Sequence, residues 1–174
     1  MSSSEPNADP TSSSADTAFG GRRSALFICT GNFHRSRFAE HLFNAVARER
    51  GLRWTASSRG TNVEGSRTFF KGRLMSPEAQ QALDALNIEF RDALRDPLQL
   101  THDDLAAADV IVAVCEEEHR PHIERDFLAA AERVRYWGVY DVPVWPAADG
   151  LAAIQRLVHE LADRLADGYH PDEV

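Results

Sequence analysis

Cys29 and Arg35 are separated by five residues, at the point where an apolar run gives way to an amphipathic pattern. A strand, a short loop and a helix N-terminus in this order bind anions, because backbone N–H groups converge and the helix dipole adds partial positive charge. Arg35 offers a planar fork for two anion oxygens. The same positive environment favours the thiolate form of Cys29. A thiolate beneath a phosphate cradle predicts phosphoryl transfer through cysteine.

The loop between these two residues has the composition of a phosphate cradle. Asn32 tolerates the left-handed backbone that a tightly wound loop requires. Ser36, directly after the loop, can donate its hydroxyl to the Cys29 thiolate or cap the following helix, and the two roles are compatible. The predicted phosphate-binding residues are Thr30, Gly31, Asn32, Phe33, His34, Arg35 and Ser36.

This pattern resembles the low-molecular-weight protein tyrosine phosphatase family, which is related to thioredoxin-coupled arsenate reductases. The order Ser58-Arg59-Gly60-Thr61 is also similar, although a small residue is usual where Arg59 stands. The resemblance runs from about Ser24 to the C-terminal helix. It implies a phosphatase that hydrolyses phosphotyrosine and other aryl phosphomonoesters through a phosphocysteine intermediate, with no metal or other cofactor.

Hydrolysis of a phosphate ester leaves an alkoxide or phenoxide, which a carboxylic acid opposite the nucleophile can protonate. The resemblance places this acid in an Asp-Pro step on the loop before the last helix. Here the segment reads Asp141-Val142-Pro143, so Asp141 is the predicted general acid and Val142 is an insertion. Asp149 is the alternative, although it is better suited to cap the final helix.

Aromatic residues are expected to form the rim of the site. The resemblance indicates that the position of Phe33 selects the substrate: an apolar residue accompanies phosphotyrosine hydrolysis, and threonine accompanies phosphoarginine hydrolysis. Tyr140 and Trp145 flank Asp141, and core packing explains these two equally well. The predicted substrate rim is therefore Phe33, Tyr140 and Trp145.

Two alternative functions remain open. An arsenate reductase on the same scaffold needs further cysteines to carry oxidation away from the nucleophile, and only Cys115 is available. The second alternative is a non-catalytic module that binds an anion or a phosphoprotein. Three departures from the family pattern keep it open: His34 where a second cysteine is usual, Arg37 in place of proline, and the inserted Val142.

The elements that must position these residues alternate between strand and helix. Such alternation predicts an α/β fold, a doubly wound parallel sheet of about four strands flanked by helices, with the phosphate loop after the first strand. Ligands bind beyond the carboxyl ends of such strands, where Cys29 stands. The expected strands are 24–29, 54–58, 110–115 and 134–137. Helices are expected to begin at 36, 76 and 101 and to cover 116–131 and 151–165, with loops at 60–74 and 138–148.

Composition sets the domain limits and excludes several classes of partner. Residues 1–22 are rich in Ser, Asp, Pro and Ala and predict a disordered tail, which leaves 23–170 as the phosphatase-like domain. A net charge of −8 argues against nucleic acid as a ligand. No apolar run approaches a membrane span, and the N-terminus lacks the pattern of a secretory signal. Only 2 cysteines are present, too few for a disulfide framework, so we expect a cytoplasmic location. The further expectations are a monomer or weak dimer and a phosphorylated protein or aryl phosphate as the substrate.

Two further clusters have simple interpretations. His119 and His122 could form a metal pair, but no third ligand stands at suitable spacing, so we expect solvated surface histidines and no metal. The 60–74 segment and the residue before it place basic side chains around two phenylalanines. We favour the interpretation that these basic side chains only increase solubility over the alternative that they guide an anionic substrate to the site. These residues are Arg59, Arg67, Lys71, Arg73, Phe69 and Phe70.

Overall fold

The computed structural model describes residues 21–168. Most of the predicted N-terminal tail and the last residues of the predicted domain, 169–170, lie outside this range. Four parallel strands form the sheet in the order β2-β1-β3-β4. The strands are β1 (Arg23–Cys29), β2 (Trp54–Gly60), β3 (Val110–Ala113) and β4 (Val134–Tyr136). The predicted α/β architecture with the cysteine loop after the first strand is confirmed.

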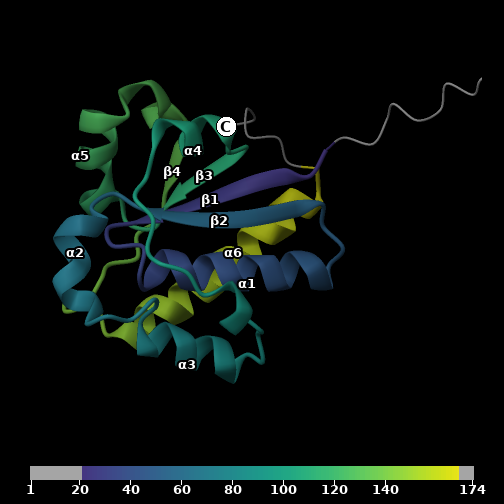
Figure 1. Ribbon diagram of the computed structural model, residues 1–174. Coiled ribbons are helices and arrows are strands. Elements are labelled where there is room, and N and C mark those ends of the chain that lie inside the picture. The colour runs from purple at the N-terminus through teal and green to yellow at the C-terminus, as the bar shows by residue number, and fades with distance from the viewer. Residues whose placement is uncertain (1–20, 169–174) are drawn as a thin grey trace, which may run out of the picture.

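Helices cover both faces of the sheet (Figure 1). On one face lie α1 (Arg35–Glu49), α3 (Pro77–Ala85) and α6 (Ala147–Ala166). The opposite face carries α4 (His102–Ala107) and α5 (Glu116–Asp126). Short 3-10 turns at Arg91–Ala93 and Leu128–Arg133 complete the chain, together with α2 (Val63–Phe70) beyond the carboxyl ends of β1 and β2.

The central strand β1 supplies both halves of the core. Its side chains alternate between faces, as the pleat of a strand requires. Ala25 and Phe27 belong to the cluster under α1, α3 and α6, whereas Leu26 and Ile28 belong to the cluster under α4 and α5. Burial on both faces explains the continuous apolar run that precedes Cys29. The strand therefore holds the loop that follows it at a fixed position.

The predicted loop at 60–74 is wrong, because it contains α2. The Asn62 side chain accepts a hydrogen bond from the backbone N–H of Gly65 and caps this helix, which ends at Phe70 and has Lys71, with φ 49°, as its C-cap. A short helix with one buried face leaves too few apolar repeats to be recognised in sequence. The helix predicted over 116–131 is also too long. It ends at Asp126, before the separate 3-10 turn.

Candidate active site

Cys29 lies at the end of β1 and is nearly buried. Its Sγ is 2.9 Å from the Ser36 hydroxyl oxygen. That oxygen also accepts a hydrogen bond from Asn32 Nδ2 at 3.0 Å, and its own hydrogen can be donated to the sulfur when Cys29 is a thiolate. A hydrogen bond donated to a thiolate stabilises its charged form. Ser36 is inside α1 and does not cap it, since the N-cap position is His34, which makes no side-chain cap.

Asn32 fixes the shape of the loop. Its backbone is left-handed, with φ 51°, and its side chain is fully buried. Nδ2 also donates to the Ser58 hydroxyl at 2.7 Å, and Oδ1 accepts from the Leu98 backbone N–H at 2.9 Å and from Arg95 Nη1 at 3.1 Å. Arg95 in turn pairs with Glu40, 3.0 Å away. The loop therefore rests on β2 and on the segment 95–98, which Glu40 of α1 holds in turn.

Gly60 allows the loop to pack directly against the end of β2. It pairs in register with Cys29, and a Cβ at this position would lie 2.7 Å from the Thr30 carbonyl oxygen and 3.0 Å from the Asn32 nitrogen. The next two backbone N–H groups, of Thr61 and Asn62, donate to the Cys29 and Thr30 carbonyls, both at 2.9 Å. Any side chain at Gly60 would push the two loops apart.

Arg35 lies buried beside the loop, with 1% of its side chain exposed. Nη1 donates to Glu118 Oε1 at 3.1 Å and to the Val139 carbonyl at 2.9 Å. Nη2 donates to Glu118 Oε2 at 2.6 Å and to Asp141 Oδ2 at 2.8 Å. Burial alone would lower the pKa of Arg35, but Glu118 and the charges of Cys29 and Asp141 raise it. The guanidinium is therefore a permanent positive charge at the base of the site.

One edge of this guanidinium has a free donor. Glu118 occupies the edge formed by Nη1 and Nη2, whereas Nε and Nη2 form the second edge of the planar group. Nε is buried and has no hydrogen-bond partner among residues 21–168, and the Nη2 side of the same edge is held by Asp141. A buried N–H without an acceptor is costly. This edge therefore suits a planar or tetrahedral anion that accepts from both nitrogens.

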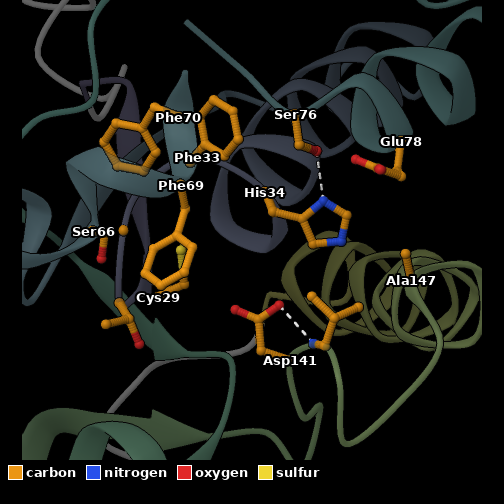
Figure 2. A pocket seen from close by; sticks show the side chains of 13 residues that line it. Cys29, Phe33, His34, Ser66, Phe69, Phe70, Ser76, Glu78, Asp141 and Ala147 are labelled. Carbon is orange, nitrogen blue, oxygen red and sulfur yellow. Dashed lines mark hydrogen bonds between the residues drawn. The ribbon is translucent and has the colours of Figure 1, made fainter. Parts of the chain in front are cut away.

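A cavity of about 390 Å³ opens above Cys29 (Figure 2). Aromatic rings of Phe33, Phe69 and Phe70 stand on one side, and His34, Glu78 and Asp141 stand on the other. Phe33 stacks on Phe70 with ring centroids 4.6 Å apart, while Phe69 is exposed to solvent. The cavity thus combines a sulfur at its base, a carboxylate at its side and an aromatic wall at its mouth.

His34 links the loop to the start of α3. Its Nδ1 is 2.6 Å from the hydroxyl oxygen of Ser76, the N-cap residue of α3, whose backbone N–H donates to the Phe33 carbonyl at 3.0 Å. Burial lowers the pKa of His34, an effect that the charge of Asp141 opposes. A histidine at this loop position is therefore accommodated as a neutral side chain that lines the cavity.

His119 is fully buried, so its prediction as a surface histidine is wrong. Nδ1 accepts a hydrogen bond from the Cys115 backbone N–H at 3.1 Å, which places the ring hydrogen on Nε2, 3.3 Å from the Thr30 hydroxyl oxygen. Burial, and then the charge of Arg35, lower the pKa of His119 to about 4. The neutral ring holds α5 against the loop.

Acid should weaken the fold through His119. Its pKa falls from 6.5 to about 4 on folding, so between these values the unfolded chain binds more protons. Stability should therefore decrease as the pH drops through this window, by about 2 kcal/mol between about pH 7 and about pH 4.5. Urea unfolding of the wild type and His119→Gln at both pH values measures this contribution, since the variant should lack it. Equal pH dependence in the two proteins would show that His119 does not titrate in this way.

Several predicted residues lie elsewhere. Tyr140 and Trp145 do not line the Cys29 cavity. Their ring centroids are 5.7 Å apart, and Tyr140 lines a neighbouring hollow that Cys115 also lines. Asp149 is exposed in the first turn of α6 and is not its N-cap, which is Pro146. Arg59 is neither a rim residue nor a solubilising charge, because it pairs with Asp104 at 2.7 Å.

Sequence reasoning missed Glu118, which joins Arg35 to the loop of Asp141. Its Oε1 also accepts from the Asp141 backbone N–H at 3.1 Å, and contact with Arg35 lowers the pKa of Glu118 against the effect of burial. The available signal was its position: an acidic residue in the first turn after a buried strand lies at the ligand edge of a parallel sheet. Three consecutive glutamates at 116–118 hid which one turns inward.

Two observations concern ligands and membranes. Among residues 21–168, no group of three or more His, Cys, Asp or Glu side chains is placed to hold a metal ion. In the same part of the chain, no helix has the length and apolar character needed to cross a bilayer.

Comparison with known proteins assigns this cysteine loop and sheet to a family. The model of the low molecular weight phosphotyrosine protein phosphatases matches residues 24–148. The chain therefore belongs to the low molecular weight phosphotyrosine protein phosphatase family, and this membership supports phosphatase activity.

Individual relatives are distant. An arsenate reductase of Bacillus cereus is 26% identical over 144 residues, covering 83% of this chain and 92% of the relative. A low molecular weight protein tyrosine phosphatase from T. tengcongensis has a TM-score of 0.69 at 24% identity, covering 82% of this chain and 99% of that one. The YwlE arginine phosphatase from Geobacillus stearothermophilus has a TM-score of 0.67 at 21% identity, covering 84% and 94%. At these identities the two solved structures establish the shared fold alone.

Proposed function

We propose that this protein hydrolyses phosphotyrosine through a phosphocysteine intermediate on Cys29. The observation that carries the proposal is the Nε–Nη2 edge of Arg35. In the described part of the chain its Nε–H has no acceptor, and an anion can displace the Asp141 carboxylate from its Nη2. Two phosphoryl oxygens fit this edge, while Glu118 keeps the opposite edge fixed. The cavity above the Cys29 sulfur gives the phosphorus atom access to the nucleophile.

In the first step, the Cys29 thiolate attacks the phosphorus atom and the bond to the tyrosine oxygen breaks. Asp141, in its protonated form, gives its proton to the departing phenoxide, so tyrosine leaves as a neutral phenol. Loop N–H groups and Arg35 hold the three remaining oxygens of the phosphoryl group. Donation from the Ser36 hydroxyl stabilises the thiolate and, in the next step, its departure.

In the second step, water attacks the phosphocysteine. Asp141, now a carboxylate, accepts a proton from the water as the new P–O bond forms and the S–P bond breaks. The products are inorganic phosphate and the regenerated Cys29 thiolate. A phosphate then leaves the Arg35 edge, and Asp141 returns to Nη2, the arrangement seen in the resting site.

The aromatic wall supports phosphotyrosine as the substrate. Phe33 and Phe70 stack at the mouth of the cavity, where a phenyl leaving group would contact them, and aromatic pairs add stabilisation beyond simple burial. A phosphoserine has too short a side chain to bring its phosphate past this wall to Cys29. We therefore propose phosphorylated tyrosine in a protein as the partner. A reactive thiolate suits a reducing cytoplasm.

Phe33→Thr should erode the preference for phosphotyrosine. Loss of the ring removes its stacking on Phe70, so kcat/KM for a phosphotyrosine peptide should fall about tenfold relative to phosphoarginine. Initial rates on matched phosphotyrosine, phosphoserine and phosphoarginine peptides measure the preference. Phe33→Tyr is the control, because it keeps a ring that can stack on Phe70. Comparable kcat/KM values for all three peptides in the wild type would show that the substrate assignment is wrong.

An arsenate reductase is the second candidate, because the relative from Bacillus cereus carries that name. Such a reaction requires a second thiol to attack the sulfur of a Cys29–arsenate adduct, so that a disulfide forms and arsenite leaves. Cys115 is the other cysteine, and burial raises its pKa, so it is mostly an unreactive thiol near neutral pH. Parallel assays with an aryl phosphate and with arsenate plus a thiol reductant decide between the two reactions. The geometry favours phosphatase.

A further inference from the structure

We propose that the groove between α3 and α6 binds the polypeptide segment that flanks the phosphorylated residue, and takes up an aliphatic side chain from it. The inference rests on the proposed phosphatase function. This groove has a volume of about 570 Å³ and shares two lining residues, Glu78 and Ala147, with the cavity above Cys29. A chain whose phosphorylated side chain enters the cavity therefore meets the groove directly beside it.

Alanines from both helices line the groove over an apolar floor, together with the longer polar side chains of Gln81 on α3 and Gln155 on α6. Phe38 and Leu151 form buried parts of the floor, and Leu86 is half-buried at its edge. Ala85 on α3 and Ala152 on α6 are exposed on its two walls. Because alanines leave the space between the helices unfilled, an aliphatic side chain from outside can reach the floor and bury apolar surface.

Charge at the junction favours a polypeptide that is neutral or basic. Glu78 is exposed in the first turn of α3, and its carboxylate points toward His34 at the boundary of the cavity (Figure 2). With a chain of net charge −8, this carboxylate disfavours acidic residues and nucleic acid in the same place. The ligand is therefore a phosphotyrosine segment with an aliphatic residue a few positions away and no acidic residue between them.

The test uses phosphotyrosine peptides of equal length in which one leucine is moved along both sides of the phosphotyrosine, with an alanine peptide as reference. At the favoured position, leucine should raise kcat/KM about tenfold, as expected for burial of one aliphatic side chain. Ala85→Arg and Ala152→Glu place side chains of opposite charge in the groove, and each should abolish that gain. Both should hydrolyse a small aryl phosphate, which fills only the cavity, at the wild-type rate.

Ala106→Glu is the matched control, since Ala106 is exposed on α4, on the opposite face of the sheet. It should keep the leucine preference. Sedimentation at the assay concentrations shows whether the variants alter self-association. A groove that serves to pair two copies of this chain would change oligomeric state without a change in peptide preference, and this result would overturn the proposal.

Failure of the phosphatase function would be visible separately. A wild type that hydrolyses no aryl phosphate contradicts the proposed function, and the groove is then tested by fluorescence anisotropy of the same peptides bound to Cys29→Ser. Leucine-dependent binding that Ala152→Glu removes supports the groove in that case. Equal turnover or equal binding of all peptides in the wild type overturns it.

Discussion

Cys29→Ser is expected to lower aryl phosphate hydrolysis by at least about a thousandfold, because a serine hydroxyl is not ionised at neutral pH and cannot replace the thiolate nucleophile. Binding of inorganic phosphate should persist, since Arg35 and the loop N–H groups do not depend on the sulfur. Initial rates measure the first effect, and calorimetric titration with phosphate measures the second. The combination separates a lost nucleophile from a lost site.

Cys115→Ser is the matched control, since Cys115 is also a buried free cysteine but lies after β3 and lines a different hollow. It should keep most of the activity if it remains folded. Substantial turnover by Cys29→Ser would exclude a phosphocysteine intermediate. Loss of phosphate binding together with activity would mean that the substitution disrupts the loop, and Cys29→Ala would then distinguish the two effects.

Local sequence was sufficient for the elements with a strong pattern. The apolar runs that became β1 and β3 have few alternatives to a buried strand, and the amphipathic repeat of α6 spans enough turns to be recognised. By contrast, α2 is held by the cap at Asn62 and by burial of Val63 and Phe70. Its stability depends on packing against the loop, which no local pattern records.

The site residues divide in the same way, into those that local sequence indicates and those whose contacts depend on the fold. Residues of the loop are contiguous, so their spacing alone was enough to predict a candidate phosphate cradle, which remains a prediction. Glu118 lies 83 positions after its partner Arg35, and Arg95 lies 63 positions after its partner Asn32, so both pairings depend on how the strands and helices are arranged. His119 was misplaced for this reason, because its burial follows from the approach of α5 to the loop. Periodicity alone cannot specify such contacts.

The inserted Val142 does not move Asp141 away from Arg35. The Val142 backbone N–H donates to Asp141 Oδ1 at 2.9 Å, and the Asp141 backbone N–H donates to Glu118. Val142 is 55% exposed and lines the Cys29 cavity beside Asp141, so the extra residue is accommodated without displacing the carboxylate. Asp141 is thereby held with one oxygen on Arg35 Nη2, the atom that the proposed mechanism gives to a substrate phosphate. In that mechanism the carboxylate and the phosphate exchange places.

Asp141→Asn should therefore have two opposite effects. Loss of the proton donor should lower kcat by roughly a hundredfold, and by less for substrates whose leaving group is a weak base. Loss of the negative charge should at the same time tighten the binding of inorganic phosphate, because the amide competes less strongly for Arg35 Nη2. Steady-state rates with aryl phosphates of graded leaving-group basicity measure the first effect, and competitive inhibition by phosphate measures the second.

Asp149→Asn is the control, since Asp149 is exposed on α6 and does not line the cavity. A variant of Asp141 that behaves as the wild type, beside a crippled Asp149→Asn, would show that the proton comes from Asp149. Weaker phosphate binding in Asp141→Asn would show instead that the carboxylate organises Arg35 for the substrate and does not compete with it.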